Sequence, residues 1–91
     1  MKRDSILLAR ILKTIEAAPY DFSDTPLDLD LEGYSEDAIA YHVLLLHEAG
    51  MITASTHGIS DDGRIRPRPI RLTWKGHEYL ERTANGMSEE A

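Results

Sequence analysis

The stretch Ser35-Glu-Asp-Ala-Ile-Ala-Tyr-His-Val-Leu-Leu-Leu-His-Glu-Ala-Gly-Met-Ile52 carries the clearest structural pattern in the sequence. Ser35 is a favourable N-cap residue, and the two acids that follow it suit the positive end of a helix dipole. Apolar residues then recur at three- and four-residue steps, which places them on one helical face. They are Ile39, Val43, Leu46 and Ala49. Because Gly50 supplies the left-handed residue that commonly ends a helix, the pattern predicts a helix over residues 36–49.

A β-hairpin with a long tip is predicted directly after this helix. Residues 51–54 suit a strand and residues 70–72 suit its partner, with residues 57–63 as turn material between them. Pro67 and Pro69 each remove a backbone donor. The returning strand is therefore expected to be an edge strand or to pair only near its end.

Two more helices flank this unit. Apolar residues at helical spacing predict a first helix over residues 4–18, which Pro19 would end. Thr73 suits the N-cap of a last helix that begins at Trp74 and ends near Ala84. Asn85-Gly86 is expected to break that helix, so residues 1–84 would form the domain and residues 85–91 a flexible acidic tail.

Between the first two helices, leucines alternate with aspartates from Leu27 to Leu31. A period of two predicts a short strand with one apolar face. Asp is a poor strand former, so an irregular extended segment is the alternative.

The apolar positions of these elements define the expected core: Leu8, Ile11, Leu12, Ile15, Ile39, Val43, Leu46, Ile52, Leu72 and Leu80. Aromatic residues at helical spacing are expected to join the core rather than to stack on bases: Tyr41, Trp74 and Tyr79. His42 and His77 are expected at helix contacts, each with one ring nitrogen hydrogen-bonded. Ile6, Leu7 and Tyr79 would supply the contact if the chain forms a homodimer.

The composition fits one small folded domain. The chain has 91 residues, of which 42% are hydrophobic and 29% charged, with a net charge of −6. It has no cysteine and no apolar stretch long enough to cross a bilayer, so a cytoplasmic protein without membrane contact is expected. The four histidines lack the spacing of a metal site. No nucleophile–base pair or phosphate-binding glycine loop is present, so neither catalysis nor a cofactor is expected.

The order helix, short strand, helix, two-stranded wing hairpin, C-terminal helix describes a small α+β winged helix. The segment from Ser35 to Ile52 resembles the recognition helix and first wing strand of bacterial winged-helix regulators, in which Leu-x-x-Ala-Gly-Leu-Ile leads into the wing. Arg71-Leu-Thr-Trp-Lys-Gly-His-Glu-Tyr-Leu80 resembles the segment that follows the wing. The resemblance departs at residues 26–33, where a helix-turn-helix needs a supporting helix and the sequence predicts a strand with at most a single turn of helix.

Most of the chain is more specifically similar to the domain of unknown function 2513 family of small phage and prophage proteins. The matching residues are Met1-Lys-Arg-Asp4, Tyr34-Ser35, Ile39-Ala40-Tyr41-His42, Ala49-Gly50 and Leu72-Thr-Trp-Lys-Gly-His-Glu78. This resemblance implies a phage or prophage context. It implies no biochemical activity.

Two opposite charge patterns suggest two functions. From Arg64 to Lys75, along the returning arm of the wing and the start of the last helix, every charged residue is a cation: Arg64, Arg66, Arg68, Arg71 and Lys75. These predict contacts to double-stranded DNA by a regulatory or accessory factor, unless the arginines are solvated or paired with nearby acids. The predicted recognition helix carries only acids, Glu36, Asp37 and Glu48, which disfavours its insertion into the major groove. These acids either compensate the helix dipole or form a contact surface for a host or phage protein, which is the alternative function.

Overall fold

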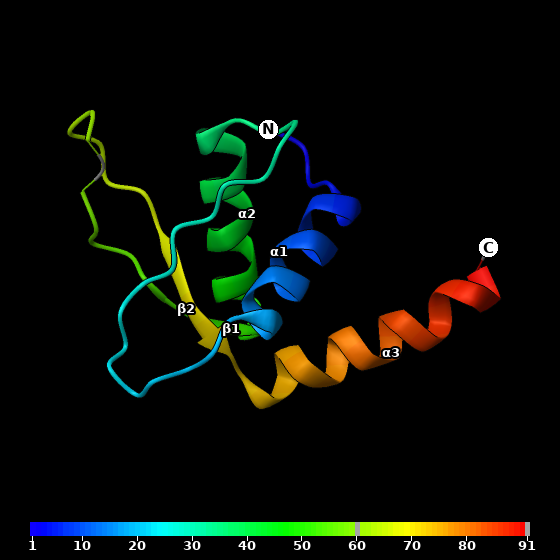
Figure 1. Ribbon diagram of the computed structural model, residues 1–91. Coiled ribbons are helices and arrows are strands. Elements are labelled where there is room, and N and C mark those ends of the chain that lie inside the picture. Colours follow the sequence, from blue (N-terminus) through cyan, green and yellow to red (C-terminus); the bar gives the residue numbers. More distant parts are fainter. Residues whose placement is uncertain (60, 91) are drawn as a thin grey trace.

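Three helices and a two-stranded sheet form the computed structural model, which describes residues 1–59 and 61–90. The elements are α1 (Ser5–Ala17), α2 (Glu36–Glu48), β1 (Ile52–Ser55), β2 (Arg68–Leu72) and α3 (Trp74–Glu90) (Figure 1). The α+β class is confirmed. Within the described residues, no helix is both long enough and apolar enough to cross a membrane.

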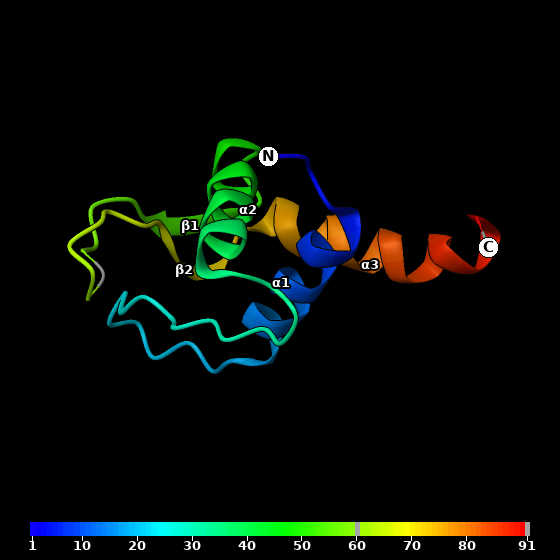
Figure 2. The same ribbon diagram turned by 90° about the horizontal axis from the view of Figure 1, so that it is seen from above.

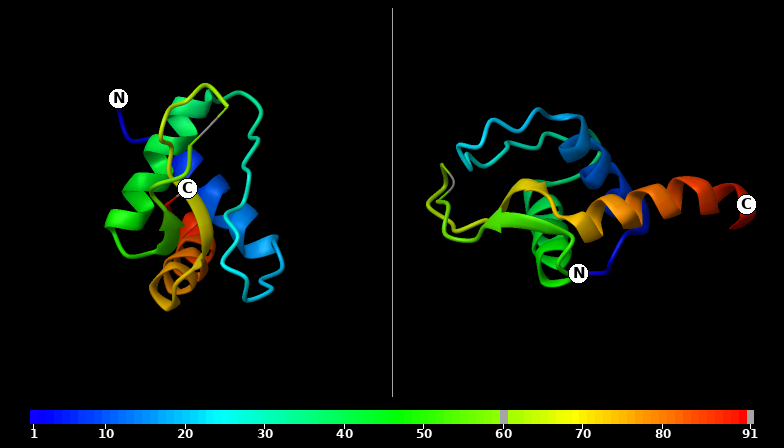
Figure 3. Two further views of the ribbon diagram at one scale, coloured as in Figure 1. Left: turned by 90° about the vertical axis from the view of Figure 1, so that its left-hand side faces the viewer. Right: turned by 90° about the horizontal axis from the view of Figure 1, so that it is seen from below.

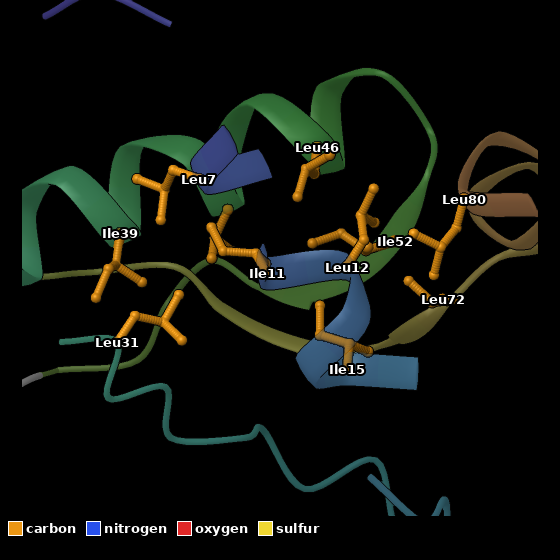
Figure 4. Close-up of a cluster of buried hydrophobic side chains, with 11 residues drawn as sticks. Leu7, Ile11, Leu12, Ile15, Leu31, Ile39, Leu46, Ile52, Leu72 and Leu80 are labelled. Atoms are coloured by element: carbon orange, nitrogen blue, oxygen red, sulfur yellow. The ribbon is translucent and has the colours of Figure 1, made fainter. Parts of the chain in front are cut away.

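Helix α1 packs across α2 and the sheet and supplies much of the core (Figure 4). Asp4 caps it, because its Oδ1 accepts from the backbone N–H groups of Ile6 and Leu7 at 2.9 and 3.2 Å. The buried face consists of Leu7, Ile11, Leu12 and Ile15. The expected core is therefore confirmed except at one position, since Leu7 is 1% exposed and Leu8 is only half-buried. Leu7 is consequently not available for the homodimer contact considered above.

The junction of α2, β1 and α3 explains two sequence motifs at once. Gly50 has φ +77° and ends α2 as predicted. Thr73 Oγ1 donates to the Gly50 carbonyl at 2.6 Å and accepts from the Gly76 N–H at 3.1 Å, so it caps α3 while holding it on this turn. A Cβ on Gly76 would lie 2.0 Å from the Met51 carbonyl oxygen. Glycine is thus required for the close approach of the two segments.

The hairpin is antiparallel, as predicted, with Ile52 opposite Leu72 and Ser55 opposite Arg68. Its register shifts between Thr53 and Ala54, so β2 holds one extra residue there. Beyond the strands, an isolated bridge between Ile59 and Ile65 keeps the two arms of the tip together.

Residues 27–31 form no strand, so the strand predicted there is wrong and the extended alternative is the observed state. One backbone bond ties this segment to the sheet, from the Leu27 N–H to the Pro69 carbonyl at 2.7 Å. In a strand, the N–H and C=O of one residue point to the same side. Pro69 has no N–H, so it cannot donate a second hydrogen bond to the segment. The ladder therefore stops after a single bond. Figures 2 and 3 show the segment running alongside α2 and the sheet.

Helix α3 and its aromatic residues differ from the prediction. The helix continues through Asn85-Gly86 to Glu90, because a single glycine weakens a helix without ending it. Gly76 and Leu80 share its buried face, which leaves Trp74 off that face and 81% exposed. His77 and Tyr41 are also exposed, whereas Tyr79 packs half-buried against the core. The core assignments of Trp74 and Tyr41 and the buried role of His77 are therefore wrong.

Candidate functional site at the hairpin tip and helix α2

The two charged surfaces predicted from the sequence meet in the structure. The hairpin tip and the N-terminus of α2 lie at the same end of the molecule (Figure 1). Arg66 contacts Asp37 and Asp62 at 3.0 and 2.9 Å and Glu36 at 3.4 Å. Its Nε also donates to Asp37 Oδ1 at 3.0 Å, and its side chain is 13% exposed. One arginine of the hairpin over residues 52–72, for which the name wing is kept only as a label, is thus enclosed by three carboxylates.

Helix α2 presents these acids because of its capping. Ser35 Oγ accepts from the Ala38 N–H at 3.1 Å, which fixes Glu36 and Asp37 in the first turn, where the helix dipole favours negative charge. Glu48 is exposed in the last turn of the same helix. The predicted acidic surface is therefore divided, with two of its residues at the wing and the third at the opposite end of α2.

The other cations that the sequence predicts to contact DNA differ in their surroundings. Arg64 reaches Asp37 and Asp62 at 3.8 and 3.9 Å, and its side chain is 69% exposed. Arg68 pairs with Asp28 of the extended segment at 3.3 Å. Within the described residues, Arg71 and Lys75 form no ion pair. Arg71 donates to its neighbouring Leu72 carbonyl and lies 5.8 Å from the Tyr20 ring centroid. The cations predicted to contact DNA thus differ in how closely acids pair with them.

The pKa values at the wing follow from these contacts. The backbone N–H of Arg64 lowers the pKa of Asp62 most strongly, with the Arg66 guanidinium adding to the effect. Hydrogen bonds to Asp37 and Asp62 raise the pKa of Arg66. Both directions favour the charged forms, so the cluster is an ion-pair network at neutral pH.

A cleft of about 510 Å³ lies beside this network, between the extended segment, α2 and the start of β2. Apolar residues form part of its wall, including Leu27, Leu29, Ile39 and Pro69. Three acids and one arginine also line it: Asp28, Glu36, Asp61 and Arg68. The cleft therefore combines apolar contact area with a negative lining, which suits a positively charged partner with apolar side chains.

Several apolar side chains are exposed in the structure, and the sequence patterns do not predict this. Phe22 is 84% exposed and has φ +66°, a conformation that is rare for a bulky residue. Ile59 and Ile65 are exposed on the hairpin tip, where they form the isolated bridge. The sequence places these residues outside the predicted helices and strands, but their exposure depends on how the loops fold back.

The structure shows how the histidine and acidic side chains are placed. Among residues 1–59 and 61–90, no three histidine or acidic side chains are grouped so that they could hold a metal ion. His42 is buried at 2% exposure, and both of its ring nitrogens have backbone partners, the Ala38 carbonyl and the Asp4 N–H. The prediction of a packed, hydrogen-bonded His42 is confirmed.

Comparison with known proteins assigns the chain to a family but indicates no activity. A family model described as "Hypothetical protein (DUF2513)" matches residues 2–87. The chain is also 31% identical over 85 residues to an uncharacterized protein of Haemophilus influenzae, which covers 93% of this chain and 70% of the relative. No solved structure matches it. The match over nearly the whole chain shows that the chain belongs to the DUF2513 family.

Proposed function

We propose that this chain is a non-enzymatic binding module on a winged-helix frame, and that its ligand is a protein rather than DNA. The observation that carries the proposal is the network around Arg66. A DNA-reading wing needs cations that are free to contact phosphates. Here the carboxylates of α2 and of the hairpin tip neutralise the most enclosed of them.

The rest of the frame supports the same conclusion. No helix lies between α1 and α2, so the supporting helix of a helix-turn-helix is lacking. Helix α2 carries no Lys or Arg, and its first turn carries Glu36 and Asp37. A groove lined with phosphates would repel this helix. An acidic helix beside an apolar and acidic cleft is instead suited to a basic protein surface. The phage and prophage context implied by the family resemblance makes a host or phage protein the class of partner we expect.

DNA binding is the competing function, and one feature favours it. Arg64 is mostly exposed, and Arg71 and Lys75 form no ion pair among the described residues. These three cations could contact phosphates without breaking the Arg66 network. Such binding would be weak, since the chain as a whole carries a charge of −6.

Fluorescence anisotropy with mixed double-stranded DNA at low and moderate salt separates the two functions. The wild type should show no DNA binding at either salt, and the variant with Arg64, Arg66 and Arg68 changed to Ala should behave identically. Affinity capture from a bacterial host lysate should recover a protein that, once purified, binds the wild type stoichiometrically in calorimetry. Salt-sensitive DNA binding that the three substitutions abolish would overturn the proposal.

A further inference from the structure

The extended segment 27–31 has an unused backbone edge. Its one bond to the sheet uses the Leu27 N–H, and successive N–H groups of an extended chain point to opposite sides. The N–H groups of Asp28 and Asp30 therefore point away from β2. Within the described part of the chain, the backbone groups of residues 28–30 have no hydrogen-bond partner. Figure 3 (left) shows this cyan segment at the outer margin, with no other element beyond it.

The side chains of the segment alternate as they do in a strand. Leu27 and Leu29 are half-buried and Leu31 is buried, whereas Asp28 and Asp30 are exposed. The two carboxylates thus lie on the outward face of an unpaired edge. Every charged side chain between Asp21 and Glu48 is acidic, so no cation of this stretch neutralises them. Arg68 pairs with Asp28 at 3.3 Å, and Asp30 forms no ion pair among the described residues.

We propose that this edge binds an extended segment of a partner protein as an added β-strand, with Lys or Arg opposite Asp28 and Asp30. The proposal rests on the proposed protein-binding function and names its mode of recognition. Main-chain hydrogen bonds to residues 28–30 would supply affinity, and alternate side chains would supply specificity. Opposite charges directly across a strand pair are stabilising. The intervening apolar residues of the partner would extend the row formed by Leu27 and Leu29.

The same aspartates exclude a second copy of this chain as the occupant. If two copies paired along this edge, aspartates would face aspartates, and like charges directly opposite each other destabilise a strand pair. Charged residues on an edge also prevent aggregation through free strands. The aspartates therefore disfavour pairing between two copies of this edge and favour pairing with a basic segment of a partner.

A random peptide library selected on the intact protein provides the test. The expected sequences carry Lys or Arg at alternate positions with apolar residues between them. Binding should slow amide hydrogen exchange at Asp28 and Asp30. The double variant Asp28→Asn/Asp30→Asn should lose about tenfold in affinity, the size expected for two cross-strand charge pairs. The matched variant Glu16→Gln/Glu81→Gln removes the same charge from exposed sites elsewhere and should bind like the wild type.

N-methylation of a selected peptide distinguishes strand addition from simple charge attraction. Methyl groups on one set of alternate amides should abolish binding, and methyl groups on the other set should leave it intact, because only one edge of the added strand faces the protein. Equal effects of both sets would overturn the proposal, as would selected peptides without basic residues or a library without binders. Peptides that bind but protect amides elsewhere would also overturn it while leaving the protein-binding function standing. Failure of that function would instead show as the salt-sensitive DNA binding described above.

Discussion

At the scale of single residues, His42 connects the start of the chain to α2. The backbone N–H of Asp4 donates to Nε2 at 2.8 Å, so Nε2 carries the lone pair. In the neutral ring the proton then lies on Nδ1, which donates to the Ala38 carbonyl at 2.7 Å. The buried ring therefore satisfies two backbone groups in one defined tautomer.

Replacing this ring should reduce stability. His42→Leu retains much of the volume but leaves the Asp4 N–H without its partner, whereas the Ala38 carbonyl retains its helical bond, so we expect a loss of about 1–3 kcal/mol in the free energy of unfolding. Urea unfolding followed by circular dichroism measures it. His47→Leu, at an exposed position of the same helix, is the control and should change little. Equal losses for both variants would contradict the role assigned to His42.

Gly76 is the second residue with a specific structural role. Gly76→Ala would place a methyl group 2.0 Å from the Met51 carbonyl oxygen, so α3 must move and the protein should lose about 1–3 kcal/mol. Gly58→Ala is the matched control, because its added Cβ would lie 3.7 Å from the nearest atom, in ordinary contact. Thermal unfolding of the two variants side by side tests the difference. A Gly76→Ala protein as stable as the control would show that the close approach of α3 to the turn is absent.

The lowered pKa of Asp62 makes the stability of the folded protein depend on pH. Its pKa in the folded protein lies below the ordinary value of 3.8, chiefly through the backbone N–H of Arg64 and then through Arg66. A lowered pKa stabilises the folded state above the ordinary pKa, and this contribution is lost as the pH falls through the folded-state value. Carbon-detected NMR titration of the carboxyl group should show a partial rise of this pKa in Arg66→Met. An unchanged pKa would mean that Arg66 does not contact Asp62 in solution.

At the scale of elements, the start of α3 depends on one hydroxyl. Thr73 Oγ1 caps the helix and bonds the turn after α2, so Thr73→Ala should cost about 1 kcal/mol or somewhat more. Thr73→Ser retains the hydroxyl and should recover most of the loss. Guanidinium unfolding of the three proteins checks the order wild type, Ser, Ala. A Ser variant as unstable as the Ala variant would assign the effect to the lost methyl group instead.

Elements with local signals were predictable from the sequence, and elements that depend on distant partners were not. Helix α2 was predictable because its cap, apolar stripe and closing glycine are all local. The segment 27–31 has the right alternation for a strand, but its pairing failed because of Pro69, which lies about forty residues later in the sequence. The length of α3 was underestimated because one glycine was given the weight of a helix end.

At the scale of the whole molecule, the candidate site was predictable in its parts and not in its assembly. The basic wing and the acidic helix are both visible in the sequence as separate surfaces. Arg66 and Asp37 are 29 residues apart, and only the folded hairpin brings them to 3.0 Å. The sequence therefore suggested DNA binding by the arginines and protein binding by the acids, although these residues form one ion-pair network in the structure. The exposure of Phe22 and Trp74 likewise depends on loop and helix orientation, which residue spacing alone does not determine.

We propose that acids of α2 neutralise the hairpin arginines and so keep the protein off DNA. The most direct test compares DNA binding of the wild type and of Glu36→Gln/Asp37→Asn by fluorescence anisotropy at low salt. We predict no binding by the wild type and salt-sensitive binding by the variant. Losing both carboxylates leaves Asp62 as the remaining acid beside Arg64 and Arg66, so both arginines become more available for phosphate contacts. Wild-type binding of the same strength as that of the variant would contradict the claim.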